Sequence, residues 1–537
     1  MKLNKNYIQT FVFLLVYLAG IYLWLQPYLE RRLPYGEYDA MSHFEVADYI
    51  AHNDKSFMSL PDYIDLRYGT DNKFKPHTLW YPPVFHTTLA TMEVISEERV
   101  LPVFLMNTIL ATFIVITLYF VINSLFGFWP AILSSVLVMF SPRDFMPYLW
   151  GQWPERFAYA FVPIILYCFY KYYISYSERE IKPIYIYLTA LFLGLNILIH
   201  PLVFFHSVVG LIVLYAFLSI KKKKILFNWR HASVCALIFL ILFMLFPYQT
   251  FNIFPRFGTS AQGRESSKSI DFSRLFHWSL NPKDYEGSVP SSYFSFSKMH
   301  GLWTLPFLLA GILVLLVRRE EKDLLMLAWL VSLYLVLHRD LLGKAQFLHR
   351  SLSASAHIFA PLTAIGTVYA ISFLKLTSIK KYAKYILIAI FLYFVFSVNM
   401  AYALNMLNKN IYNPYNQSGF FSSLNNEEFE AAQWALDNVP KSYNLSVLGI
   451  PRDISETAKK IRWFAAASGH VTKYYNPDDK ENHLKNFYII MDYTMLGPLQ
   501  DKKTFEIMQS FEKNELLSHT LVYDRKNIKV YKLGIKN

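Results

Sequence analysis

Charged residues are scarce in this chain. Only 17% of its 537 residues are charged, against about 25% in a typical soluble protein, and 54% are apolar. The apolar residues gather in nearly uncharged runs of roughly 17 to 23 residues, the length that crosses a hydrocarbon core of about 30 Å. This composition excludes a disordered chain and an ordinary cytosolic protein, and it predicts a multi-pass protein of the cell membrane.

Cysteine is almost absent as well. Cys168 and Cys235 are the only two, and both lie inside apolar runs, so a disulfide framework is excluded. Acidic residues are outnumbered by basic ones, which leaves a net charge of +13. Such an excess can indicate nucleic-acid binding, but here much of it lies in short loops between apolar runs. We therefore expect membrane lipids, and no nucleic acid, as partners of the basic residues.

Hydropathy and helix-breaking residues predict a polytopic α-helical membrane protein with about eleven transmembrane helices. If the N-terminus lies inside the cell, the Lys and Arg clusters of the short loops all fall on the cytoplasmic side, as the positive-inside rule requires. An odd number of spans then places the C-terminus outside. The expected spans cover about residues 7–27, 100–122, 127–141, 156–174, 183–199, 202–220, 231–249, 300–317, 323–338, 352–374 and 384–406.

Most of the polar sequence is then predicted to lie outside the cell. Residues 1–407 form the membrane domain, whose outer loops cover residues 28–99, 142–155 and 250–299. Residues 408–537 predict a small extracytoplasmic α/β domain. Its expected helices cover 427–438, 455–467 and 504–512, its expected strands cover 444–450 and 487–492, and a hairpin joins 518–523 to 528–533.

The first outer loop opens with an acidic segment. Asp39 and His43 are spaced i, i+4 and would share one face of a helix that lies against the membrane surface. A carboxylate at the mouth of a helical bundle can act as a base or as a metal ligand. The alternative is that Asp39 is a helix N-cap, which would stabilise the helix by about 1 kcal/mol.

The segment 142–155 holds three prolines, which predict an open backbone between two spans. Glu155 lies at the outer end of a span, where a carboxylate is costly unless it has an ion-pair partner or a functional role. The alternative to a functional role is an ion pair with Arg156. Trp150 and Trp153 suit the interfacial aromatic belt, although they could equally stack on a sugar ring.

Further basic groups are expected at the same membrane face. Arg350, preceded by His349, presents a guanidinium suited to bidentate phosphate binding, with snorkelling to lipid headgroups as the alternative. Arg256 and Arg264 belong to a polar segment typical of an active-site lid, or of a disordered loop.

Taken together, this layout resembles the GT-C superfamily of integral-membrane glycosyltransferases, which use polyprenyl-phosphate-linked sugars. The best matches are Glu37-x-Asp39 and the Tyr-Pro-Pro-x-x-His stretch of residues 81–86, and segments 430–435, 463–470 and 522–533 look like the tails of archaeal and bacterial members. The tail has no Trp-Trp-Asp signature, and no Asp-Glu pair follows the first span. The resemblance therefore points to an uncharacterised branch.

The resemblance implies inverting sugar transfer from a polyprenyl-phosphate donor to a lipid, glycan or protein acceptor on the outer face. Asp39 looks like the catalytic base, and the residues expected around donor and phosphate are Arg350, His349, Glu155, His43, Arg256 and Arg264. It stays open whether a divalent cation, Mg²⁺ or Mn²⁺, bridges Asp39, Glu155 and phosphate. The alternatives are a secondary transporter, which would be expected to show inverted repeats, and a non-catalytic scaffold, which would tolerate neutralising Asp39.

Overall fold

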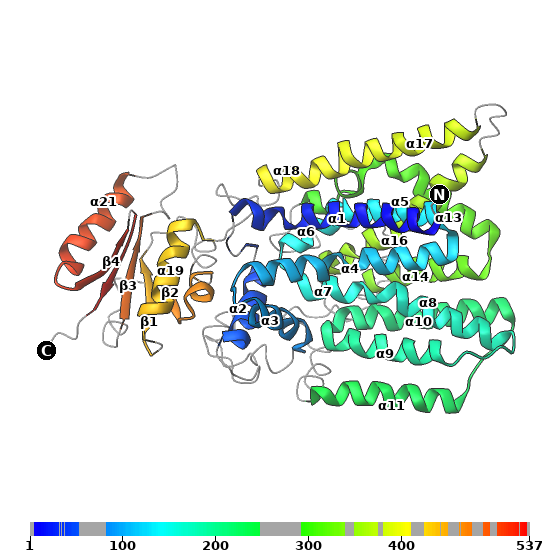
Figure 1. The fold of residues 1–537 in the computed structure, drawn as a ribbon, viewed down its shortest axis with the longest axis horizontal. Coiled ribbons are helices and arrows are strands. Elements are labelled where there is room, and N and C mark those ends of the chain that lie inside the picture. The colour runs from blue at the N-terminus through cyan, green and yellow to red at the C-terminus, as the bar shows by residue number, and fades with distance from the viewer. Residues whose placement is uncertain are drawn as a thin grey trace, which may run out of the picture.

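The computed structural model (Figure 1) shows a long helical bundle at one end and a small α/β unit at the other. It describes residues 5–31, 33, 35–36, 38–52, 82–247, 291–338, 348–373, 380–409, 424–440, 442–448, 461, 463–474, 487–493, 502–525 and 527–533. This arrangement confirms the predicted fold class, a polytopic helical protein with a small C-terminal α/β unit.

A helix lies at each of the eleven positions where a span is expected. Among the described residues, seven helical segments are long and apolar enough to cross a membrane: Asn6–Leu29, Leu101–Phe126, Trp153–Ser177, Pro201–Lys222, Ser297–Arg318, Ser351–Ser372 and Tyr385–Met406. The other four helices have 12 to 17 residues and are α5 (Phe128–Met139), α9 (Ile184–Ile199), α11 (Trp229–Leu245) and α14 (Glu321–Leu337).

The long segments comprise the following helices. They are α1 (Lys5–Arg31), α4 (Leu101–Phe126), α7 (Trp153–Tyr159) with α8 (Phe161–Ser177), α10 (Pro201–Lys222), η7 (Ser297–Gly301) and η8 (Leu302–Thr304) with α13 (Leu305–Arg318), α15 (Leu348–Ser353) with α16 (Ser355–Phe373), and α17 (Lys380–Phe394) with η10 (Val395–Met400) and α18 (Ala401–Lys409). A 3₁₀ turn, η6 (Ser291–Phe294), precedes η7.

The basic loops meet at the end of the bundle farthest from the α/β unit, where α1 also begins (Figure 1). Helices α10 and α13 end in left-handed caps at Lys223 and Arg319. An ion pair between Lys222 and Glu321 ties the two neighbouring turns together. The clustering of basic loops at one end agrees with the positive-inside reasoning, and the orientation across the membrane stays a prediction.

The segment expected to be an open loop at 142–155 is helical and buried. Pro142 and Pro154 lie in the first turns of α6 (Pro142–Leu149) and α7, where the missing N–H of proline costs nothing, so they start helices instead of breaking them. Trp150 and Trp153 are buried. The placement of these two indoles in an interfacial belt is therefore wrong.

Two short helices lie between the bundle and the α/β unit (Figure 1). Helix α2 (Tyr38–His52) packs beside α3 (Val84–Ser96). The helix expected near residue 44 is thus present, but every residue from Ala40 to Tyr49 is buried. It is therefore an internal helix and not one that lies on a surface, because α3, the 142–155 segment and the C-terminal unit cover it.

The C-terminal unit is built on one sheet with the strand order β2-β1-β3-β5-β4. Strands β1 (Asn444–Leu448), β2 (Thr472–Tyr474) and β3 (Phe487–Asp492) are parallel, whereas β5 (Ile528–Lys532) is antiparallel to β3 and to β4 (Thr520–Arg525). Helix α21 (Lys502–Phe511), followed by η13 (Glu512–Leu516), covers the outer face, and α19 (Asn426–Asn438) covers the face toward the bundle (Figure 1). The boundary expected at 407/408 adjoins residues outside the described part and stays a prediction.

In the described part of the chain, the side chains of Trp463 and Arg99 hydrogen-bond the C-terminal unit to the first-loop region. The indole Nε1 of Trp463 donates to the Gly36 carbonyl oxygen at 3.3 Å. The Arg99 guanidinium donates to the carbonyl oxygens of Ala467, at 2.6 Å, and Ala466, at 3.1 Å, and pairs with Asp48 on α2. Arg99 therefore joins the short-helix layer to the C-terminal unit.

We expect Arg99→Ala to lower the free energy of unfolding by about 3 kcal/mol, because a largely buried carboxylate and two carbonyls lose their donor. Unfolding in detergent, followed by tryptophan fluorescence, measures this. The matched control is Arg525→Ala, whose 68% exposed side chain pairs with Glu430 at 3.8 Å and should contribute less than about 1 kcal/mol. Equal losses in both variants would contradict a docking role for Arg99.

Candidate active site

Asp39 lies in the first turn of α2 and is partly exposed. It is past the cap position, so the N-cap alternative does not describe it, although its charge still suits a helix N-terminus. The turn between α6 and α7 packs directly against this point, because Gly151 lies against the backbone of Asp39 and Ala40. The structure thus brings together the two sequence segments that carry Asp39 and Glu155.

Gly151 is required at this contact for two reasons. Its φ is +85°, and a Cβ on it would lie 1.8 Å from the amide nitrogen of Ala40. We expect Gly151→Ala to disrupt the packing of α2 on α6 and α7 and to destabilise the protein by well over the 1–3 kcal/mol or so that backbone strain alone costs. Thermal unfolding in detergent measures this.

Gly127→Ala is the matched control, since Gly127 has a φ of +87° but nothing within 4 Å of the point that an added methyl group would occupy. It carries the strain without the clash. If both variants lost the same stability, the close approach at Gly151 would be irrelevant.

A layer of buried charges lies behind this turn. Arg156 forms an ion pair with Asp144, and His357 Nε2 lies 2.8 Å from the other Asp144 carboxylate oxygen. Arg156 also stacks over the ring of Trp24, with its guanidinium carbon 5.1 Å from the centroid. Burial would raise the pKa of Asp144, but Arg156 and His357 together lower it below its ordinary value. Asp144 is therefore ionised.

A second buried guanidinium belongs to Arg143. Its Nε lies 3.4 Å from His300 Nε2, and His300 also meets the Ser355 hydroxyl at 3.2 Å. The guanidinium carbon lies 4.5 Å from the centroid of the Tyr293 ring. Burial raises the pKa of the Tyr293 hydroxyl. Trp150 packs on Tyr293 at 4.8 Å, which links this group to the turn beside Asp39.

Both arginines keep donors that meet no acceptor within the described part of the chain. These are Nη1 of Arg143 and both Nε and Nη1 of Arg156, all buried. An unsatisfied N–H on a buried cation is costly. The arrangement can hold an anion that presents several oxygens, as a phosphate does.

Glu155 is buried beside the same layer, and its charge acts on Tyr293. His43 does share the region of α2 that follows Asp39, but its Nδ1 bonds to His86 Nε2 at 2.8 Å. Burial lowers the pKa of His86 to about 3, so that ring is neutral. The two histidines join α2 to α3.

The structure describes only part of the remaining predicted site residues. His349 and Arg350 belong to α15, whose backbone packs beside α6, the helix of Arg143 and Asp144; their side chains lie outside the described residues. Arg256 and Arg264 also lie outside them.

Sequence reasoning missed Arg143, Tyr293 and His300 as members of this layer. The only local signal was the pair Arg143-Asp144 directly after an apolar run, since charge there needs a partner. Tyr293 and His300 carry no such signal, because Arg143, which both of them contact, is about 150 residues away in the sequence.

One family model matches most of the chain. It is DUF6541, a family of unknown function, and it covers residues 8–451. No curated protein matches the chain.

Several solved structures are similar in fold. ArnT from Cupriavidus metallidurans, bound to undecaprenyl phosphate, is 9% identical with a TM-score of 0.56 over 97% of both chains. The archaeal oligosaccharyltransferase AglB from Archaeoglobus fulgidus, in complex with an inhibitory peptide and a dolichol-phosphate, is 15% identical with a TM-score of 0.54, over 87% of this chain and 64% of that one. An Archaeoglobus fulgidus oligosaccharyltransferase in complex with Zn and sulfate is 13% identical with a TM-score of 0.50, over 86% and 62% of the two chains. Identities this low show the fold alone, and it is the fold that the resemblance implies.

Proposed function

The chain belongs to DUF6541, a family of unknown function, and we propose that it is a GT-C-type glycosyltransferase that takes its sugar from a polyprenyl-phosphate-linked donor. The fold supports this proposal, since two proteins of similar fold were solved with bound undecaprenyl phosphate and in complex with a dolichol-phosphate.

The observation that carries the proposal is the pair of buried arginines with open N–H groups. Arg143 and Arg156 lie inside the bundle, on and beside apolar helices, where a lipid-linked substrate could enter from the membrane. Guanidinium groups bind phosphate oxygens bidentately, and they bind more strongly where water is excluded. They would stabilise the negative charge that develops on the leaving phosphate.

Asp39 is the group that we assign as general base. It is partly exposed, so an acceptor could approach it from the side of the C-terminal unit, and its backbone touches the turn that leads to Glu155 and Arg156. In a single displacement, the acceptor oxygen bonds to the anomeric carbon and its proton passes to Asp39. The bond from that carbon to the phosphate oxygen breaks, and the polyprenyl phosphate leaves with the electron pair, which inverts the anomeric configuration.

A divalent cation also fits the carboxylates at this place. Asp39 and Glu155 come from segments that meet at Gly151, and carboxylate oxygens suit Mg²⁺ or Mn²⁺. Such an ion would add positive charge at the leaving phosphate. The roles given to Asp39, Arg143 and Arg156 do not depend on it.

Transfer of labelled sugar by the purified, reconstituted protein tests the proposal. The donors form a panel of polyprenyl-phosphate sugars, and the acceptors include lipid, glycan and peptide fractions. We expect one donor class to give a product of inverted configuration. If no donor is hydrolysed and no sugar is transferred, in a preparation that binds undecaprenyl phosphate, the transporter and scaffold alternatives are favoured instead.

A further inference from the structure

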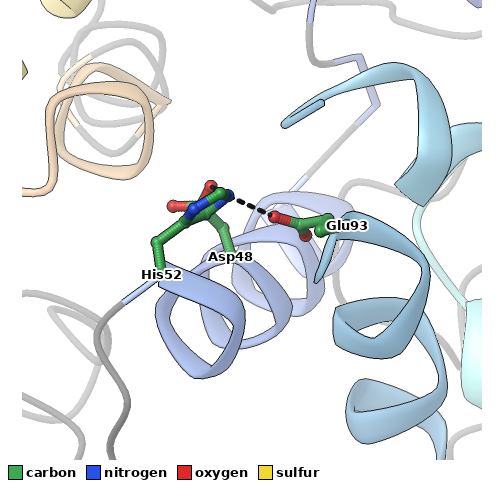
Figure 2. A group of neighbouring side chains, drawn as sticks. All are labelled: Asp48, His52 and Glu93. Carbon is green, nitrogen blue, oxygen red and sulfur yellow. Dashed lines mark ion pairs between the residues drawn. The ribbon is translucent and has the colours of Figure 1, made fainter. Parts of the chain in front are cut away.

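A separate group of potential ligands lies at the far end of α2. Asp48 and His52 are one helical turn apart on α2, and Glu93 reaches toward them from α3 (Figure 2). His52 Nε2 lies 3.1 Å from Glu93 Oε2 and 3.8 Å from Asp48 Oδ1. One ligand atom from each residue lies within 4.8 Å of the other two.

We infer that Asp48, His52 and Glu93 form a structural zinc site that fastens α2 to α3. An imidazole with two carboxylates is a donor set that suits Zn²⁺ better than Mg²⁺, which prefers oxygen alone. Ligand atoms about 2.0–2.1 Å from a tetrahedral zinc lie about 3.3 Å from each other. The separations of 3.1 and 3.8 Å are close to that value. The fourth position would face solvent, since the side chain of His52 is 42% exposed.

Glu93 supplies the independent reason for a cation here. Its side chain is fully buried, and its Oε1 meets no hydrogen-bond donor among the described residues. A carboxylate that is removed from water and lacks hydrogen-bond donors is costly at this position. A bound cation would remove that cost.

Arg99 does not replace the cation. Its guanidinium binds both oxygens of Asp48, whereas Glu93 makes its ion pair with His52. Each carboxylate oxygen has two lone pairs, so Asp48 can accept from Arg99 and still coordinate a metal. Zinc binds a neutral imidazole, and with His52 neutral the two carboxylates and one guanidinium leave one negative charge in excess, which favours a positive ion.

The site is distinct from the one proposed for catalysis. Asp48 follows Asp39 by nine residues, or about 14 Å along an α-helix. The zinc would bind Asp48, which also pairs with Arg99, the residue that hydrogen-bonds to the C-terminal unit. The inference does not rest on the proposed transferase activity, and its test measures metal binding alone.

The test uses the full-length protein in detergent, stripped with a chelator and titrated with ZnCl₂. Bound zinc is measured by mass spectrometry and calorimetry for the wild type, His52→Ala, Glu93→Gln and the control Glu98→Gln, an exposed carboxylate just beyond α3. We expect one tight zinc in the wild type and the control. Both site variants should bind it at least about 100-fold more weakly, since even outer-shell partners contribute 10- to 100-fold.

Two results would overturn the inference. One is a wild-type chain that binds no zinc, which would make the cluster an ordinary ion pair with a protonated His52. The other is equal zinc binding by the wild type and His52→Ala, which would place the metal elsewhere. If Glu93→Gln does not fold, His52→Ala decides alone, because its half-exposed side chain can be removed at little cost to the core.

Discussion

Asp39→Asn is expected to abolish sugar transfer almost completely while leaving donor binding intact. Removing a general base typically costs a factor of about 10²–10⁴ in rate. Asparagine keeps the shape of the side chain in the first turn of α2 but cannot take the acceptor proton. The measurement is kcat for transfer beside the affinity for undecaprenyl phosphate, in the same reconstituted preparation.

Asp437→Asn is the matched control for this variant. Asp437 is exposed on α19, on the C-terminal unit, and its neutralisation should change neither quantity. Wild-type kcat in a folded Asp39→Asn protein would remove Asp39 as the base. A loss of donor affinity equal to the loss of rate would instead make Asp39 a binding residue.

Arg143→Gln is expected to weaken donor binding about 10- to 200-fold, the equivalent of one charge-assisted hydrogen bond worth about 1.5–3 kcal/mol. Arg143 is the more informative of the two buried arginines to replace. Its neighbours His300 and Tyr293 are not carboxylates, so replacing Arg143 leaves no buried carboxylate without its ion-pair partner. Replacing Arg156 would leave Asp144 in that state. Affinity for undecaprenyl phosphate in detergent measures the effect, and transfer should fall by at least as much.

The control for Arg143→Gln is Arg230→Gln. Arg230 is exposed at the start of α11, at the basic end of the bundle, and should not affect phosphate binding. Unchanged affinity in Arg143→Gln, with the protein folded, would mean that the open N–H groups of this layer serve another ligand.

The fold could be predicted from the sequence where local patterns decide it. The apolar runs mark the helix positions, and strand β3 was predicted at the observed residues because its apolar side chains and bounding polar segments are local features. Strand β2 was missed. It has three residues and exists through its parallel pairing with β1, which lies more than 20 residues away.

The candidate site was predicted only in part, for a similar reason. Asp39 and Glu155 are visible in the sequence, since a carboxylate beside an apolar run needs an explanation. The burial of α2 is not visible, because its cover comes from α3, Gly151 and the C-terminal unit. Prolines in 142–155 suggested an open loop, yet proline also begins helices, and only tertiary packing selects between the two.

The proposed function depends most on one placement, in which the phosphate of a polyprenyl donor lies against the buried arginines of α6 and α7. Photo-crosslinking tests it most directly, with an undecaprenyl phosphate that carries a diazirine next to the phosphate and with adducts located by mass spectrometry. We predict adducts in residues 142–156 and 291–300, and their loss when unlabelled undecaprenyl phosphate is added in excess. Adducts confined to the basic loops at the opposite end of the bundle, or insensitive to competition, would contradict this placement.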